Sequence, residues 1–480
     1  MLLVTSCGRQ NSPEQLAERH CSTCHAFVPP DALDKKAWKD GVLPEMAFRM
    51  GLEVSKLSSF RQGDLDIILK TLPSRAMVSD EEWKLISEYY IDNAPDMLSI
   101  PSAAEPLGLT QFEGSAVRLN MQSNTMLTMV KYNQDLKKYF VGTRRGRLYQ
   151  LSAVMAMEDS FDLQSPPSAM IFQSDKSALL SGMGIMDPSE QPAGSIISLV
   201  PSEGKFETII DSLQRPVYFE QADLNNDGEK DILVSAFGNF TGDLVAFEKT
   251  DTGYQPHVIH NFPGTRKTIV RDMNGDGLQD ILALVTQGDE HIALFTNRGN
   301  FRFAYRVLLK FPPVNGSSYF ELCDINLDGN PDILYTNGDN ADYSPILKPY
   351  HGVRLFLNDG RNDFHESLFY PMHGASMARA EDFDEDGDID IAAISFFPDF
   401  KNHPEQGFIY LENSNGQFTS YSTPLASVGR WITMESSDID DDGDKDILLA
   451  ALNFPDRVPG SLVKQWQENP VSVLVLRNMR

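Results

Sequence analysis

From about residue 112 onward, short apolar segments alternate with turn sequences in a pattern that recurs along the chain. An extended segment such as 217–222 leads into an acidic loop, and an apolar segment such as 232–235 follows that loop. A second hairpin then ends in an Asn-Gly or similar turn, as at 413–416. Apolar segments of this length between such turns are typical of β-strands. Each repeat therefore predicts four strands.

The spacing of the repeats indicates a β-propeller. The acidic loop occurs five times, and its first aspartates are separated by 49, 52, 58 and 56 residues, which fits propeller blades better than a solenoid. Two further four-strand repeats, at 126–164 and 169–211, precede the first acidic loop and lack its pattern. Residues 112–480 thus predict a mainly β fold with seven blades. The last repeat ends after its third strand, 471–477, so we expect residues 111–119 to supply the fourth and close the ring.

Each acidic loop has side-chain oxygens at its first, third, fifth and ninth positions and a glycine at its sixth. Such a loop can wrap around a hard cation that takes six to eight oxygen ligands, so the pattern predicts calcium sites. The expected side-chain ligands are Asp223, Asn225, Asp227, Asp231, Asp272, Asn274, Asp276, Asp280, Asp324, Asn326, Asp328, Asp332, Asp382, Asp384, Asp386, Asp390, Asp438, Asp440, Asp442 and Asp446.

This loop pattern, for example from Asp438 through Gly443 to Asp446, resembles the FG-GAP or VCBS repeat family of calcium-binding β-propellers. The resemblance covers roughly three quarters of the chain. It implies that calcium is mostly structural and ties together a loop whose carboxylates would otherwise repel one another. It also implies a backbone carbonyl ligand at the seventh position, which is occupied by Glu229, Leu278, Asn330, Asp388 and Asp444.

Residues 13–98 predict a small all-α domain that precedes the propeller. Residues 14–20 have helical spacing, and Ser79 with Glu82 forms a capping box that begins an amphipathic helix through Ile91. The following segment, 99–111, has no periodic apolar pattern and contains two prolines, so it predicts a semi-rigid spacer.

The most specific chemical motif of the chain is the segment Cys21-Ser22-Thr23-Cys24-His25. Two thiols three residues apart can each form a thioether with a haem vinyl group, and the adjacent imidazole then lies at the iron. A zinc site would need a second pair of ligands at comparable spacing, and a thioredoxin-like pair would need a βαβ context; neither is present in the sequence. The motif therefore predicts covalently attached haem c.

The region around this motif, residues 13–98, resembles a small class I cytochrome c. Haem c iron usually takes a second axial ligand, and Met46, Met50 and Met77 are the candidates. In ordinary class I cytochromes the ligand precedes the last helix, which favours Met77. The segment 43–47 resembles the pattern of cytochrome domains fused to repeat propellers, and on that resemblance we favour Met46. The choice among the three methionines stays open.

Residues 1–12 are expected to be a truncated lipoprotein signal and tether. Val4-Thr5-Ser6-Cys7 resembles the cleavage box of bacterial lipoproteins, in which Cys7 would be lipidated. A secretory signal needs a basic start and ~7 to 15 apolar residues, of which only the last few are present. The alternative is an ordinary cytoplasmic start. Because haem attachment also demands export, we expect a lipid-anchored protein of the bacterial periplasm or cell surface.

Charge narrows the range of partners. The chain has 41 basic and 68 acidic residues, a net charge of −27, which argues against nucleic acid or an anionic membrane surface as partner. The expected calcium ligands include 17 of the carboxylates. Cys323 precedes an acidic loop and is expected to be a small buried hydrophobe. No apolar run in the sequence approaches the ~20 residues of a membrane span.

Two features outside these motifs could contribute to function. Long connections at 337–352, 396–407 and 453–470 should lie on one face of the propeller, where a partner or substrate could bind. The strands that lead into the acidic loops should line the central channel, where their charged residues could form a polar funnel or, as we favour, simply the polar walls of a water-filled channel. The residues at the corresponding position are Glu220, Ile269, Glu321, Arg379 and Glu435.

Three functions remain open from the sequence. The first is an exported electron-transfer protein whose propeller docks a redox partner protein or a surface glycan. The second is an oxidoreductase that acts on a carbohydrate-like substrate with haem as electron acceptor. The third is an adhesion or scaffold lipoprotein with a haem sensor. Because the sequence shows an attachment motif for haem but no catalytic motif, the first is favoured.

Overall fold

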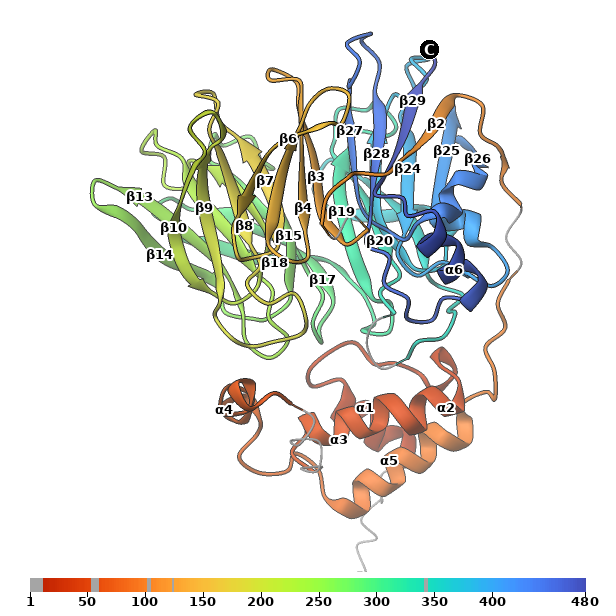
Figure 1. The fold of residues 1–480 in the computed structure, drawn as a ribbon. Coiled ribbons are helices and arrows are strands. Elements are labelled where there is room, and N and C mark those ends of the chain that lie inside the picture. The colour runs from red at the N-terminus through yellow and green to blue at the C-terminus, as the bar shows by residue number, and fades with distance from the viewer. Residues whose placement is uncertain (1–11, 53–59, 102–104, 123–124, 341–343) are drawn as a thin grey trace, which may run out of the picture.

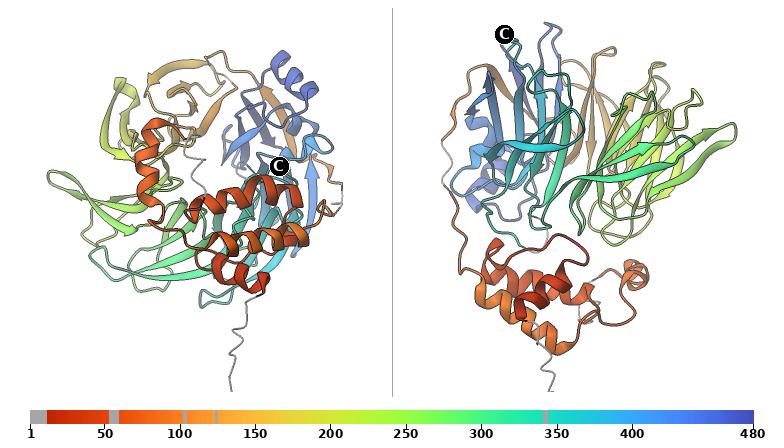
Figure 2. Two further views of the ribbon diagram at one scale, coloured as in Figure 1. Left: turned by 90° about the horizontal axis from the view of Figure 1, so that it is seen from below. Right: turned by 180° about the vertical axis from the view of Figure 1, so that it is seen from behind.

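The structure is a computed structural model that describes residues 12–52, 60–101, 105–122, 125–340 and 344–480. It has a propeller of seven β-sheets and a small helical domain that lies against one end of the propeller (Figures 1 and 2). The C-terminus lies near the opposite end (Figure 1). Cys7, the predicted lipidation site, lies outside the described residues.

The first three blades are formed by consecutive strands. Blade 1 has β3 (Leu127–Asn133), β4 (Lys138–Thr143), β5 (Arg147–Leu151) and β6 (Met157–Asp162). Blade 2 has β7 (Pro167–Phe172), β8 (Ala178–Gly182), β9 (Gly194–Val200) and β10 (Lys205–Leu213). Blade 3 has β11 (Pro216–Ala222), β12 (Asp231–Ala236), β13 (Asp243–Thr250) and β14 (Gly253–His260).

The remaining blades follow the same order. Blade 4 has β15 (Thr265–Arg271), β16 (Asp280–Val285), β17 (His291–Asn297) and β18 (Phe303–Lys310). Blade 5 has β19 (Ser317–Cys323), β20 (Asp332–Asn337), β21 (Gly352–Asn358) and β22 (Phe364–Pro371). Blade 6 has β23 (Ala375–Glu381), β24 (Asp390–Ser395), β25 (Phe408–Ser414) and β26 (Gln417–Ser422). Blade 7 has β27 (Trp431–Ser437), β28 (Asp446–Ala451), β29 (Val473–Asn478) and β2 (Phe112–Val117).

The apolar pattern of each repeat determines which strand is buried. Every residue of β12, β16, β20, β24 and β28 is buried, because the second strand of a blade packs against the neighbouring blades on both faces. The fourth strands are largely exposed, as in β18. The predicted seven blades are confirmed, and β6 begins four residues earlier than the sequence pattern indicated.

Ring closure follows the predicted route. Strand β2 pairs antiparallel with β29, so a strand from the N-terminal side completes the last blade. The sequence did not predict a second closure contact. Strand β1 (Leu107–Gly108), inside the expected spacer, pairs parallel with β26 and adds a fifth strand to blade 6. The spacer therefore contacts blade 6 at a point in the chain that precedes β2, the strand that closes the ring.

The helical domain is built around α1 (Pro13–Cys21) and α5 (Asp80–Asn93), which pack against each other. Both helices begin with a capping box, Ser12 with Gln15 and Ser79 with Glu82, as expected for the second. The other helices of the domain are α2 (Lys35–Ala37), α3 (Leu43–Arg49), α4 (Gln62–Thr71), the 3₁₀ turn η1 (Pro30–Ala32) and the π-helical segment η2 (Trp38–Val42). Apolar side chains from all of these elements except α4 form one core, which includes Leu16, Trp38, Ile86 and Tyr90.

The inner strands bring charged side chains together, as the channel prediction expected. Arg379 Nη1 lies 2.8 Å from Glu321 Oε2, and Lys131 Nζ lies 2.7 Å from Glu435 Oε2. The Glu220 carboxylate accepts a hydrogen bond of 3.0 Å from the hydroxyl of Tyr218. Ile269 does not join this charged group and packs in a hydrophobic cluster instead.

Lys267 belongs to the same charged group, although its position was not among those selected from the sequence. Its ammonium lies 3.7 Å from the centroid of the Tyr319 ring, and burial lowers the pKa of Lys267 to about 7. We attribute a structural role to this group, because its buried positive and negative side chains neutralise one another.

Candidate functional site

A cavity of ≈ 660 Å³ lies between the helical domain and the propeller. Cys21, Cys24 and His25 all line it, so the three residues of the attachment motif open onto the same space. On the same side the cavity is bounded by large apolar side chains, among them Trp38 and Trp83. Its volume lies within the ~300 to 1,000 Å³ usual for sites that enclose cofactors.

The motif is positioned by the end of α1. The helix ends at Cys21, and Thr23 Oγ1 donates a 2.7 Å hydrogen bond to the His20 carbonyl in the turn that follows. Nδ1 of His25 donates a 2.8 Å hydrogen bond to the Ala26 carbonyl. This bond leaves Nε2 of the imidazole as the nitrogen that can bind a metal, an arrangement typical of metal-bound histidines.

The two thiols have different surroundings. Burial raises the pKa of the Cys21 thiol, which keeps it protonated near neutral pH, and the Tyr90 hydroxyl lies 3.9 Å from its sulfur. The same hydroxyl donates a 2.8 Å hydrogen bond to the Val28 carbonyl. Cys24 is exposed. Two free thiols, an imidazole with one open nitrogen and apolar walls together fit a haem attached to this motif.

All three candidate distal methionines line the cavity. Met46 lies on α3, and Met50 caps the end of that helix. Met77 is 45% exposed, and its backbone N–H donates a 3.0 Å hydrogen bond to the Met50 carbonyl. The geometry brings the three side chains to one cavity without selecting among them, so Met46 stays a prediction.

The opposite side of the cavity belongs to the propeller. It is lined by connections of blades 3, 4 and 5, including Phe240, Glu290 and Val314, and by Arg266 at the start of β15. These short connections could not be predicted as part of a site, because neither their length nor their composition distinguishes them. Among the described residues of the three long connections, those that line this cavity, such as Lys348, come from the connection between β20 and β21.

All three long connections line a second, neighbouring cleft of ≈ 500 Å³. Its lining includes the Phe-Pro-Asp segment at 397–399, whereas the last connection, which forms α6 (Gly460–Glu468), contributes Arg457, Val458 and Pro459. Arg430 joins two of these connections: it is buried, its guanidinium lies 4.0 Å from the Phe396 ring centroid, and Nη1 donates to the Phe454 carbonyl at 2.8 Å. These contacts give the residues around Phe396 and Phe454 a structural role in packing two of the long connections together.

The acidic loops share one hydrogen-bonding scheme. The ninth-position aspartate is fully buried at the start of the second strand, and its two oxygens accept backbone N–H groups from the loop and from the last two residues of the third strand. In blade 7, Asp446 Oδ2 accepts from Ile439 and Oδ1 from Asn478, each at 2.9 Å. The sixth-position glycines have positive φ, 103° at Gly443, a conformation that side chains rarely adopt. The equivalent ninth-position residues are Asp231, Asp280, Asp332 and Asp390.

Two loops bring three carboxylates to within 4.8 Å of one another, as a cation site requires. These groups are Asp382, Asp384 and Asp390 in blade 6 and Asp438, Asp440 and Asp446 in blade 7. Among the described residues, Asp382 Oδ1 and Asp438 Oδ1 are buried without a hydrogen-bond partner. These orphaned oxygens fit a cation. In the other three loops the third position is an asparagine, which brings less negative charge.

Asp444 adds a carboxylate that the sequence analysis did not assign. Both of its side-chain oxygens are buried without a partner in the part of the chain that the structure describes. Burial next to Asp442 and Asp446 raises the pKa of Asp444 to about 6. The resemblance assigned only the backbone carbonyl of this residue to calcium, so the carboxylate is a further candidate ligand.

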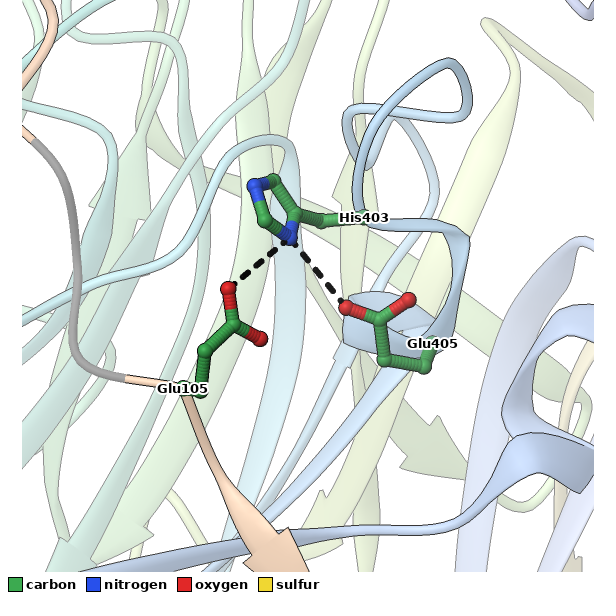
Figure 3. A group of neighbouring side chains, drawn as sticks. All are labelled: Glu105, His403 and Glu405. Atoms are coloured by element: carbon green, nitrogen blue, oxygen red, sulfur yellow. Dashed lines mark ion pairs between the residues drawn. The ribbon is translucent and has the colours of Figure 1, made fainter.

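Glu105, His403 and Glu405 form a third cluster on the outside of blade 6 (Figure 3). His403 Nδ1 lies 3.7 Å from Glu105 Oε1 and 3.3 Å from Glu405 Oε1. The Glu105 side chain is 73% exposed, so ordinary ion pairing accounts for the cluster. The cluster brings Glu105 of the spacer next to the connection that precedes β25.

Comparison with known proteins places two segments, residues 272–335 and 382–449, in the FG-GAP-like repeat family. The chain is therefore a seven-bladed β-propeller that carries FG-GAP-like repeats. No curated protein matches the chain. Among solved structures, the chain is similar to the WD40 domain of Neurospora crassa Pan2, with 14% identity, coverage of 79% of this chain and 98% of that chain, and a TM-score of 0.46. None of the described helices has the length and apolar character needed to cross a membrane.

Proposed function

We propose that this protein is an exported c-type haem electron-transfer protein whose propeller, stabilised by calcium, is a platform for docking or ligand binding. The observation that carries the proposal is the cavity onto which Cys21, Cys24 and His25 all open. A structural role for the two cysteines would not require both thiols to lie beside an imidazole on a cavity of cofactor size.

Each residue of the motif has a distinct task in this proposal. Cys21 and Cys24 hold the haem through thioethers, and His25 binds the iron through Nε2 while the Ala26 carbonyl holds Nδ1–H. A bound haem c supplies one-electron transfer at its iron. Met46 is the preferred second axial ligand, with Met50 and Met77 as the alternatives.

Calcium has a structural role in this proposal. The twenty loop ligands lie in blades 3 to 7, and the orphaned oxygens of Asp382 and Asp438 support cation binding most strongly in blades 6 and 7. A cation there neutralises carboxylates that the fold brings close together, so binding favours the folded loop. The loops lie away from the cavity, since none of their residues lines it.

The expected partners are a redox protein or a surface glycan. Lipidation of Cys7 would anchor the protein to a membrane without spanning it, in the periplasm or at the cell surface of a bacterium. A second candidate function is an oxidoreductase for a carbohydrate-like substrate, because the propeller side of the cavity offers polar side chains such as Asn239, Gln287 and Asn340. Haem reduction that depends on an added sugar would favour this second function.

The test is expression in a host that matures c-type cytochromes, followed by denaturing electrophoresis with haem staining. The wild-type protein should keep its haem under denaturing conditions. Cys21→Ala and Cys24→Ala should each lose one covalent link, and the double variant should lose haem entirely. Cys323→Ala is the matched control, because this cysteine lies in β19 away from the cavity. A wild-type protein without covalent haem would refute the proposal.

A further inference from the structure

The propeller forms one of the two walls of the cavity. The wall of the helical domain carries the attachment motif, and the facing wall comes from three neighbouring blades. Phe240 and Val314 make part of the propeller wall apolar, whereas Arg266, Glu290 and Asp339 place charged or ionisable groups on it. A ligand held by the motif would therefore contact the propeller wall as well as the helical domain.

A chain of buried hydrogen bonds holds the first part of this wall in place. Asp64 of α4 is buried and accepts hydrogen bonds from Ser189 Oγ at 2.9 Å and from the backbone N–H of Glu190 at 3.0 Å. The Glu190 carboxylate in turn accepts the backbone N–H groups of residues 239–241 at 2.8 to 3.1 Å. The helical domain is thus connected, through Glu190, to the loop that carries Phe240 into the cavity.

Further contacts fix the two domains on both sides of the cavity. The Arg49 guanidinium lies 4.3 Å from the centroid of the Phe240 ring, and the Phe60 ring meets that ring edge to face at 5.8 Å. On the other side, the Tyr350 hydroxyl donates a 3.1 Å hydrogen bond to the Ala32 carbonyl. These contacts tie each side of the helical domain to a different blade, so the wall has a defined position relative to the motif.

The charged and ionisable groups of the wall are also held in position. Arg266 Nη1 lies 3.2 Å from Asp339 Oδ2, and Glu290 accepts hydrogen bonds from the hydroxyl and the N–H of Ser317. Charges held at fixed positions beside a bound group act on that group more strongly than mobile charges in solvent.

We propose that the propeller is the second half of the haem site, and that the wall formed by blades 3 to 5 sets the reduction potential of the haem. This inference rests on the proposed function, since it requires haem at the motif. Solvent exposure and neighbouring charge are recognised determinants of haem potential. A positive charge on the wall favours the reduced state, which carries one positive charge less at the iron, and a negative charge favours the oxidised state.

The test uses the ion pair of the wall. Arg266→Gln should lower the haem midpoint potential, and Asp339→Asn should raise it. For one charge acting across a cavity of this size, we expect each change to alter the equilibrium constant of haem reduction on the order of tenfold. The matched controls are Arg306→Gln and Asp363→Asn, which remove the same charges from a 3.2 Å pair on the outer face of the propeller. Potentials are measured by spectroelectrochemical titration of the full-length holoprotein.

Opposite shifts in the two wall variants, with little change in the controls, would support the inference. A general loosening of the fold could not produce shifts of opposite sign. If both wall variants carry covalent haem and titrate like the wild type, or shift in the same direction, the inference is wrong while the proposed function stands. If the wild type carries no covalent haem, the proposed function itself fails. Should one variant not fold, the sign of the other still decides.

Discussion

Replacing Asp446 by alanine tests whether the acidic loops hold the blades together. Asp446 is fully buried, and its carboxylate accepts the backbone N–H groups of Ile439 and Asn478 at 2.9 Å each. A hydrogen bond to a charged group contributes about 1.5 to 3 kcal/mol, so the two bonds together contribute roughly 3 to 6 kcal/mol. Burial also raises the pKa of Asp446, which offsets part of this gain. We therefore expect the variant to lose roughly 3 kcal/mol.

Urea denaturation of the calcium-loaded protein measures this loss. Trp431, one of four tryptophans in the chain, is fully buried in β27 of the same blade, so tryptophan fluorescence changes when this blade unfolds. The matched control is Asp441→Ala in the same loop, because Asp441 is exposed and pairs with Lys137 at the surface. Such a surface pair contributes at most about 1 kcal/mol. Equal losses in the two variants would refute the role assigned to the ninth aspartate.

Four further predictions follow from the structure. Burial raises the pKa of Glu290 from its ordinary 4.5 to about 8, so the folded protein holds a proton that the unfolded chain releases, and stability falls as pH rises through this range. Glu290→Gln should reduce this fall in thermal melts from pH 5 to 9, and a variant with the wild-type pH profile would contradict the prediction. Met46→Ala should abolish the absorption band of thioether-bound ferric haem; loss of the band in Met50→Ala or Met77→Ala instead would reassign the ligand. Asp64→Ala removes the buried carboxylate that accepts the backbone N–H of Glu190 across the two domains, so this amide hydrogen should exchange faster than in the wild type. Equal exchange rates would argue against docking of the domains through this contact. Chelation of calcium should lower the melting temperature of the propeller while covalent haem remains, and simultaneous loss of haem would contradict a purely structural role.

The blades could be predicted from the sequence because their signals are local. The apolar strands and the glycine at each sixth loop position recur in every acidic repeat, and local conformation follows from them. The closure by residues 112–117 could be predicted because an unpaired edge would otherwise remain. Strand β1 could not, since two residues carry no periodicity.

The candidate site was predictable only on the side that carries a motif. Cys21, Cys24 and His25 are neighbours in sequence, so their chemistry is visible without a structure. The facing wall is assembled from positions such as Phe240, Arg266 and Asp339, which lie far apart in sequence and become neighbours only through the ring of blades. The buried Asp64 gave no signal either, because an aspartate in the first turn of a helix usually interacts with that helix alone.

The attachment of haem to Cys21 and Cys24 is the central claim, and intact-protein mass spectrometry of protein from a maturation-competent host tests it most directly. The account predicts a mass increase of one haem that survives denaturation and acid–acetone extraction, with a c-type spectrum in alkaline pyridine. The double variant Cys21→Ala with Cys24→Ala should have the mass of the polypeptide alone. A wild-type protein with the unmodified mass, or one whose haem is extracted by acid–acetone, would contradict the account.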